Sequence, residues 1–145
     1  IAFGEAITDE FKTYCQNVID NAQALAKAMV AREYQLISGG TDNHLMLIDL
    51  RNKGENMTGK LAENTLVKCH ITINKNTVPF ETRSPFVTSG IRIGTAAITS
   101  RGLKPNNMER IAHFIDSALL AANDEVALDK IKDEVMSFMK AFPLY

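Results

Sequence analysis

Apolar side chains recur at helical spacing over residues 9–32, which predicts a long helix with one buried face near the start of the chain. Thr8 stands directly before this stretch and is of a residue type that caps helix N-termini. At about 1.5 Å per residue, the predicted helix is roughly 36 Å long. Because a small domain covers less than that length, we expect this helix to connect to another part of a larger protein.

Two β-prone runs come next, at residues 34–38 and 45–50, and the sequence Gly-Gly-Thr-Asp-Asn at residues 39–43 separates them. Glycine, asparagine and aspartate favour tight turns, so the pattern predicts an antiparallel hairpin. A second helix is predicted from a cap at Thr58 to about residue 69.

The second half of the chain combines strands and helices. Alternating isoleucines predict strands at residues 70–74 and 90–95, with a long loop at residues 75–88 between them. Helices are predicted from Pro105 onward and over residues 124–141. This order of elements predicts an α+β fold in which a small antiparallel sheet packs with helices.

Composition narrows the class of protein without identifying it. With 145 residues, of which 46% are hydrophobic and 23% charged, the chain has the composition of a soluble globular domain. A formal net charge of −1 gives no reason to expect nucleic acid as a partner, and no apolar run approaches the ~20 residues of a membrane helix. The histidines lack a second ligand at helical spacing, so no metal site is expected.

Arg92 is the first candidate for a binding residue. It lies between Ile91 and Ile93 in the second predicted strand, so alternation turns it to the opposite face. Gly90 and Gly94 flank it, and we expect their missing side chains to leave open space beside the guanidinium. Such a slot suits a planar carboxylate bound by two parallel hydrogen bonds. The alternative is an edge-strand arginine in a surface ion pair, which the pattern alone favours because such pairs are common.

The long loop and the strand before it hold the other candidates. Asn74 and Asn76 can each donate and accept hydrogen bonds, which suits a heterocyclic ligand, but the pattern alone favours simple turn bonds to the backbone. Ser84, Pro85 and Phe86 form a rigid kink with a hydroxyl group and an aromatic ring, which either lines a pocket or seals the core beneath the loop. The residue pattern by itself leaves these alternatives open.

Several longer strings of residues carry a resemblance to a known family. They are Ser-Gly-Gly-Thr-Asp-Asn-His-Leu at residues 38–45, Ile-Thr-Ile-Asn-Lys-Asn at residues 71–76, and Ser-Pro-Phe-Val-Thr-Ser-Gly-Ile-Arg-Ile-Gly-Thr at residues 84–95. In residues and spacing these strings resemble the C-terminal portion of serine hydroxymethyltransferase, and the resemblance extends over essentially the whole chain. Ala96 departs from the pattern, since many family members carry proline there, which affects only a local turn.

The resemblance implies a fold and an activity. The fold would be that of the small C-terminal domain of the aspartate-aminotransferase-like, fold type I pyridoxal-phosphate enzymes. Residues 1–33 would form the end of the large domain with a long connecting helix, and residues 34–145 would form the small domain. The activity would be that of a glycine hydroxymethyltransferase, which interconverts serine plus tetrahydrofolate with glycine plus 5,10-methylenetetrahydrofolate. The family further implies a cytoplasmic homodimer or homotetramer in the full-length form.

The resemblance also assigns residues to ligands. Arg92 would hold the α-carboxylate of serine or glycine, and Asn76, Ser84, Pro85 and Phe86 would bind tetrahydrofolate. The family's cofactor lysine lies in a Thr-rich segment ending in His-Lys, and no lysine of this chain has that context. The groups that hold pyridoxal 5'-phosphate are therefore expected upstream. No catalytic residue is expected within the chain, which by itself should be inactive.

Two other functions stay open. One is a different pyridoxal-phosphate enzyme of the same fold, such as an aminotransferase, which would share an arginine but not the folate loop. The other is a stand-alone domain that binds a small ligand and has no catalytic partner. The start at Ile1 instead of methionine leads us to expect a fragment.

Overall fold

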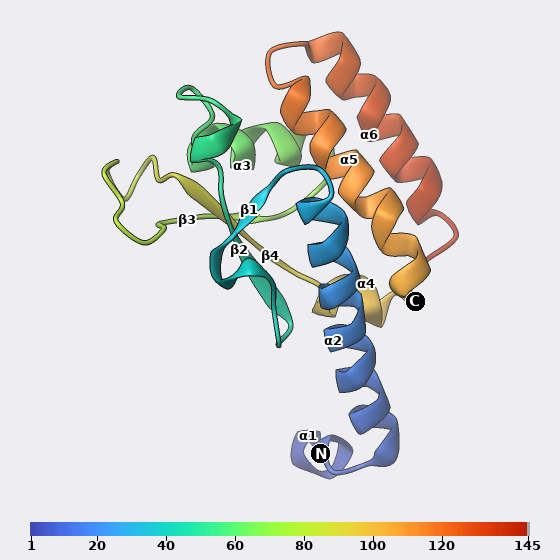
Figure 1. Cartoon of the computed structure of the whole chain (residues 1–145). Helices are drawn as coiled ribbons and strands as arrows, with labels where there is room; N and C mark the ends of the chain where they lie inside the picture. The colour runs from blue at the N-terminus through green and yellow to red at the C-terminus, as the bar shows by residue number, and fades with distance from the viewer. Residues whose placement is uncertain (145) are drawn as a thin grey trace.

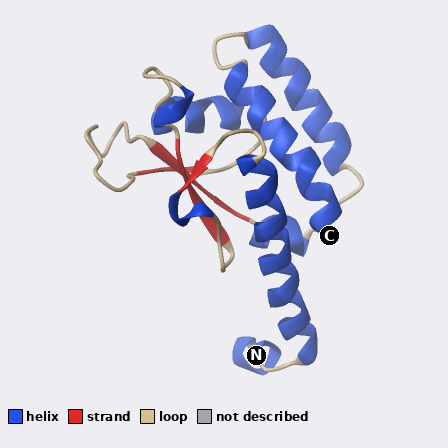
Figure 2. Cartoon of the chain, viewed as in Figure 1, coloured by secondary structure: helices blue, strands red, loops and turns tan. Residues whose placement is uncertain are grey.

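Helices and one small sheet make up the computed structural model, which describes residues 1–144 (Figure 1). The helices are α1 (Ala2–Ala6), α2 (Asp9–Val30), α3 (Gly59–Lys68), α4 (Ala96–Ser100), α5 (Met108–Leu120) and α6 (Glu125–Met139). The strands are β1 (Gln35–Leu36), β2 (Leu45–Asp49), β3 (Asn74–Asn76) and β4 (Gly90–Gly94). They form an antiparallel sheet in the order β1-β2-β4-β3, with helices packed beside it (Figure 2). The predicted α+β class with a small antiparallel sheet is confirmed.

The first long helix, α2, agrees with the prediction. Thr8 caps it, because the Thr8 side-chain oxygen accepts a hydrogen bond from the backbone N–H of Phe11 at 3.2 Å. Leu25 and Met29 are fully buried in its C-terminal half, whereas its first two turns contain no buried residue. Figure 1 shows this end of α2, together with α1, projecting away from the sheet. The Phe3 ring is exposed there, so α2 extends beyond the core as its length predicts.

The hairpin and the second helix are also confirmed, with one difference. β1 and β2 pair antiparallel, but the predicted strand over residues 34–38 is too long. Ser38 adopts a left-handed φ of 66°, and the chain turns through a 3₁₀ helix at Ile37–Gly39. α3 begins after Thr58, whose side chain accepts a hydrogen bond from the backbone N–H of Leu61 at 3.0 Å.

The strand predicted over residues 70–74 lies instead at Asn74–Asn76. α3 ends in a left-handed turn at His70, whose φ is 60°, and the N–H of Ile71 bonds back to the last turn of the helix at 2.9 Å. These residues therefore close the helix and do not pair in the sheet. The alternation that suggested a strand reflects the burial of Ile73 in the core.

The C-terminal helices agree with the prediction in part. α4 is a short helix that the hydrophobic pattern does not predict. Pro105 begins a 3₁₀ turn, and α5 starts only at Met108. The buried residues of α6 are Leu128 and Val135, and Ile131, Phe138 and Met139 of the same helix are partly buried against the core. Within residues 1–144, no helix is both long and apolar enough to cross a membrane.

The sheet has two unlike faces, because side chains alternate along each strand. The residues of one face are buried in the core with side chains of α2, α3 and α5, and they are Met46, Ile48, Ile91 and Ile93. The other face, here called the open face, carries Arg92 of β4 opposite Leu47 of β2 and Asn74 of β3. The predicted orientation of Arg92, away from the neighbouring isoleucines, is confirmed.

Candidate functional site

Arg92 lies on the open face in a strand that has neighbours on both sides, so it is not an edge-strand residue. Its side chain is exposed and forms no hydrogen bond or ion pair with any residue that the structure describes. The surface ion pair that the sequence left as an alternative does not form within that part of the chain. The guanidinium therefore keeps all of its N–H donors available for a ligand.

Asn74 and Asn76 share the open face with Arg92. β3 pairs with β4 so that Asn74 lies directly opposite Arg92, while Asn76 lies opposite Gly90, one diagonal position away. Positions related in this way lie about 5–8 Å apart. The side-chain N–H of Asn76 donates to the carbonyl of Thr77 at 2.7 Å, which is a local turn bond that the sequence also allowed. The fold thus brings Arg92 and Asn76, from opposite ends of the long loop, onto one surface.

The two glycines beside Arg92 differ from each other. Gly90 is buried, and a side-chain carbon there would lie 2.5 Å from the Val78 side chain and 2.7 Å from a β2 carbonyl. The open space expected at Gly90 is therefore filled, and that prediction is wrong. At Gly94, which is exposed, the nearest atom would be the carbonyl of His44 at 3.4 Å. Of the two glycines beside Arg92, only Gly94 would accept a side chain without a clash.

Ser84, Pro85 and Phe86 form a turn within the loop between β3 and β4. The carbonyl of Ser84 accepts hydrogen bonds from the backbone N–H groups three and four residues later, at 2.9 and 3.0 Å. All three residues are exposed, and Phe86 retains 80% of its surface, so they do not seal the core beneath the loop. In the described part of the chain they make no hydrogen bond with Arg92 or Asn76. The structure therefore brings together Arg92 and Asn76 but leaves this turn apart from them.

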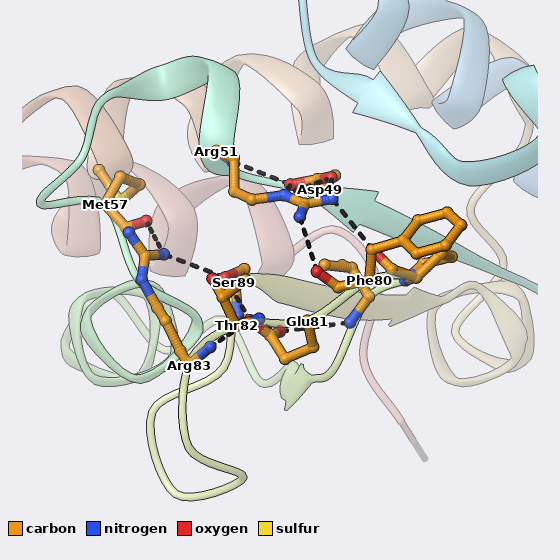
Figure 3. A network of polar contacts seen from close by, with 10 residues as sticks. Asp49, Arg51, Met57, Phe80, Glu81, Thr82, Arg83 and Ser89 are labelled. Carbon is orange, nitrogen blue, oxygen red and sulfur yellow. Dashed lines mark hydrogen bonds and ion pairs between the residues drawn. The ribbon is translucent and has the colours of Figure 1, made fainter.

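A network of polar contacts that the sequence did not predict holds this loop in place (Figure 3). The carboxylate of Glu81 accepts hydrogen bonds from the backbone N–H groups of Thr82 at 3.1 Å, Arg83 at 3.0 Å and Ser89 at 2.8 Å. The Ser89 hydroxyl donates to it as well, at 2.6 Å. Partial burial raises the pKa of Glu81, but these hydrogen bonds outweigh that effect and hold the pKa at about 2. Glu81 is therefore a carboxylate at neutral pH.

Two arginines tie the same loop to the rest of the domain (Figure 3). Arg83 donates to the carbonyl of Glu55 at 2.5 Å, in the segment before α3. Arg51 donates to the carbonyls of Pro79 at 3.2 Å and Phe80 at 3.3 Å. The loop is thus held from within by Glu81. Arg51 binds it from the segment after β2, and Arg83 of the loop binds the segment before α3.

Arg51 is fixed in turn by Asp49, a buried residue at the end of β2. The two side chains form an ion pair at 2.6 Å. Burial raises the pKa of Asp49, but the hydrogen bonds and the charge of Arg51 outweigh burial and lower the pKa below its ordinary value. Asp49 pairs with Gly90 across the sheet, so this ion pair links the end of the open face to the loop.

Sequence reasoning missed Glu81, Arg83 and Arg51, because charged residues in a loop carry no periodic signal. The sequence feature that could have indicated an ordered loop is the pair of opposite charges at positions 81 and 83, between Pro79 and Pro85. A loop of this length in a compact domain is usually either functional or disordered. The charge pair indicates a structured loop but does not identify the hydrogen-bond partners.

The strand residues of the open face include no lysine, which bears on the cofactor that the resemblance implies. Lys75 lies between Asn74 and Asn76 but faces the other way, and its amine forms an ion pair with Glu63 at 3.1 Å. The strands therefore offer no Schiff-base lysine beside Arg92, and these residues do not by themselves fit pyridoxal phosphate. Across the described residues, no cluster of three or more potential metal ligands occurs.

A comparison with protein families gives an independent result. The sequence model of the family described as serine hydroxymethyltransferase matches residues 1–115 of the 145-residue chain. The match includes α1 to α4, the whole sheet and the loop between β3 and β4, and it ends within α5. It therefore covers every candidate residue described above.

Proposed function

This chain belongs to the serine hydroxymethyltransferase family, and on that premise we propose that it is the C-terminal part of a pyridoxal-phosphate-dependent glycine hydroxymethyltransferase. The complete enzyme would interconvert serine plus tetrahydrofolate with glycine plus 5,10-methylenetetrahydrofolate. Residues 1–33 would connect to a large domain, and residues 34–145 would form the small domain. We further propose that the complete protein is a cytoplasmic homodimer or homotetramer and that the isolated chain is inactive.

The observation that carries this proposal is the position of Arg92. Its guanidinium is exposed on the open face, has no partner among the described residues, and has an exposed glycine, Gly94, two positions along the strand. A planar guanidinium without a competing carboxylate suits the α-carboxylate of serine or glycine, which it can bind by two parallel hydrogen bonds. Arg92 would then fix the orientation of the amino acid, which is a positioning effect on the reaction.

The folate site is proposed at the other polar groups around this face. Asn76 has an amide that both donates and accepts, so it suits the donor and acceptor edge of a pterin ring. Ser84, Pro85 and Phe86 offer an exposed hydroxyl group and an exposed aromatic ring on a loop that polar contacts hold in place. Asn76 lies in the strand that pairs with β4, and the Ser84–Phe86 turn belongs to the loop that leads into β4, which supports a folate site next to the amino-acid site.

The cofactor is proposed to be held mainly by residues outside this chain. Pyridoxal phosphate, when bound, withdraws electrons from the Cα atom of the amino acid. The open-face strand residues include no lysine, and Lys75 is turned away and paired with Glu63. The role of this chain in the reaction would therefore be to bind and orient the serine carboxylate and the folate.

The experiment that tests the proposal replaces Arg92 in the complete enzyme. Arg92→Ala should lower kcat/KM for serine, because truncating one partner of a charge-assisted pair costs roughly 2–5 kcal/mol, or about 30-fold and more in rate. Arg92→Lys should recover only part of the loss, since the charge returns without the fork geometry. Arg110→Ala, which removes an exposed arginine of α5, is the matched control and should behave like the parent.

Cofactor absorbance and serine kinetics are measured together for all four proteins. Retained absorbance with a selective loss of serine turnover would support the assignment of Arg92 to the substrate. Normal serine turnover by Arg92→Ala would contradict it. Serine turnover that proceeds without tetrahydrofolate would instead point to another pyridoxal-phosphate enzyme of the same fold.

A further inference from the structure

We infer that Glu81 is a positioning residue for the loop that presents Ser84, Pro85 and Phe86, and that it sets the affinity for the folate without affecting the amino acid. The inference rests on the proposed function, since it requires this loop to bind tetrahydrofolate. Glu81 itself is partly buried and is assigned no contact with either substrate.

The hydrogen bonds of Glu81 close the loop from both ends. Besides the N–H groups of the two residues that follow it, its carboxylate receives the N–H of Val78 at 3.4 Å, near the start of the loop. At the end of the loop, Ser89 donates both its N–H at 2.8 Å and its hydroxyl at 2.6 Å. One side chain thus joins residues that lie eleven positions apart in the sequence, from 78 to 89, and encloses the Ser84–Phe86 turn.

The Glu81 carboxylate accepts hydrogen bonds from backbone N–H groups of the loop, as carbonyl groups do in the strands and helices of the domain. Residues 77–89 contain no α-helix and no strand, so their backbone donors lack ladder partners. A flexible loop of this length would have to order on binding, and prior ordering improves affinity by removing that cost. Glu81 therefore acts on the folate through the conformation of the loop.

The backbone of the loop is held in conformations that need such support. Phe80 has a φ of 57° and Thr88 a φ of 58°, a region that bulky and β-branched residues rarely adopt. Phe80 is nevertheless 94% exposed, so burial of its ring does not explain its conformation. Its carbonyl is held by Arg51, and Glu81 follows it directly. Strained backbone that the surroundings hold in place is characteristic of binding loops.

The amino-acid site is separate from this network. Arg92 forms no hydrogen bond with Glu81, Arg83 or Ser89 among the described residues. In the contacts that hold the loop, Arg83 bonds to the segment before α3 and to Ser89, and Arg51 bonds to loop carbonyls. Loosening the loop should therefore weaken the folate site while the serine site stays intact.

The test uses the complete enzyme with Glu81→Gln. All hydrogen-bond partners of Glu81 are donors, whereas a glutamine amide offers a single acceptor oxygen and turns an N–H₂ group toward the other donors. Hydrogen bonds to charged groups contribute more to stability than hydrogen bonds between neutral groups, so the variant should hold the loop less firmly. The KM for tetrahydrofolate should therefore rise roughly ten- to a hundredfold. The KM for serine and the cofactor absorbance should stay within about twofold of the parent. Glu81→Asp, which keeps the charge with a shorter reach, should restore part of the folate affinity.

Glu109→Gln is the matched control, because it makes the same chemical change at an ion pair of α5 with Arg32, outside this network, and should leave both KM values unchanged. Ser89→Ala removes the hydroxyl that donates to Glu81 and accepts a bond from Arg83, but it keeps the backbone N–H bond to Glu81. It should raise the folate KM in the same direction by a smaller factor, which keeps the test decisive if Glu81→Gln fails to fold. Equal rises in both KM values, or an unchanged folate KM in Ser89→Ala and Glu81→Asp, would overturn the inference. If the parent enzyme shows no folate-dependent conversion of serine, the proposed function itself fails, which is a different result from failure of the variants alone.

Discussion

On one face of the sheet Ile91 and Ile48 are fully buried against the helices, whereas on the other face Arg92 and Asn74 are exposed, although Ile91 and Arg92 are neighbours in β4. The buried face is held by apolar packing, which is non-directional and contributes most of the stability of a domain. The open face contributes polar groups that have few partners within the domain. Alternation along one strand thus separates residues that stabilise the fold from residues free to bind a ligand.

The loop between β3 and β4 is a third case, because it is ordered mainly by charges. Its internal contacts converge on Glu81, and its outer contacts come from Arg51 and Arg83. Such contacts are directional and respond to pH, whereas the apolar core does not. The effects of substitutions on the free energy of unfolding should therefore differ in size and in pH dependence between the two faces and the loop.

The largest effect is expected on the buried face. Ile91→Ala removes a fully buried side chain from the centre of the core and should lower the free energy of unfolding by about 2–5 kcal/mol. Urea unfolding followed by circular dichroism measures the change. Val30→Ala, at an exposed position of α2, is the control and should stay within about 0.5 kcal/mol of the parent. Similar losses for both variants would mean that the core is not centred on β4.

A second effect is expected where α3 meets the end of the loop. A side-chain carbon at Gly59 would lie 2.1 Å from the Thr88 hydroxyl and 2.4 Å from the carbonyl of Gly90, so Gly59→Ala forces backbone to move. Overpacking of this kind costs about 1–3 kcal/mol. Gly4→Ala makes the same change in α1 with no atom within 4 Å and should be neutral or stabilising. Thermal unfolding of the two variants compares them, and equal melting temperatures would contradict the close packing.

Much of the buried face could be predicted from the sequence. Helical spacing located α2, and the isoleucines around Arg92 gave β4 and its orientation, because burial of one face imposes a period on the residues. The strand at 70–74 was wrong because a left-handed turn at His70 ends α3, and apolar alternation there marks burial without pairing.

The candidate site was predictable only in part. The position of Arg92 relative to Asn76 follows from strand register, which a single sequence does not specify. The residue pattern identified both as candidates, and the resemblance supplied their roles. Gly90 illustrates the limit, since its missing side chain makes room for Val78 and not for a ligand. Glu81 was missed because its partners are backbone N–H groups, which every sequence has.

A smaller effect is expected in the loop and depends on pH. The pKa of Glu81 is held at about 2, below its ordinary value of 4.5, so its stabilisation is fully present above about pH 4.5 and is lost as pH falls through about 2. Allowing for solvent screening, this amounts to roughly 1–2 kcal/mol. Glu81→Gln should be less stable than the parent at pH 7, and the two stabilities should converge toward pH 2. Urea unfolding at several pH values measures this, and parallel curves would show that the charge of Glu81 does not stabilise the loop.

The smallest effect on stability is expected at Arg92, the most important residue of the proposed site. Because its exposed side chain has no partner among the described residues, Arg92→Ala should change the free energy of unfolding by no more than about 0.5 kcal/mol. Ile93→Ala, one position along the same strand but on the buried face, should cost about 2–5 kcal/mol. Urea unfolding of the two variants therefore measures the contrast between the faces at adjacent positions. A large loss in Arg92→Ala would mean that the guanidinium stabilises the sheet itself, and the loss of serine turnover expected for that variant would then no longer identify a binding residue.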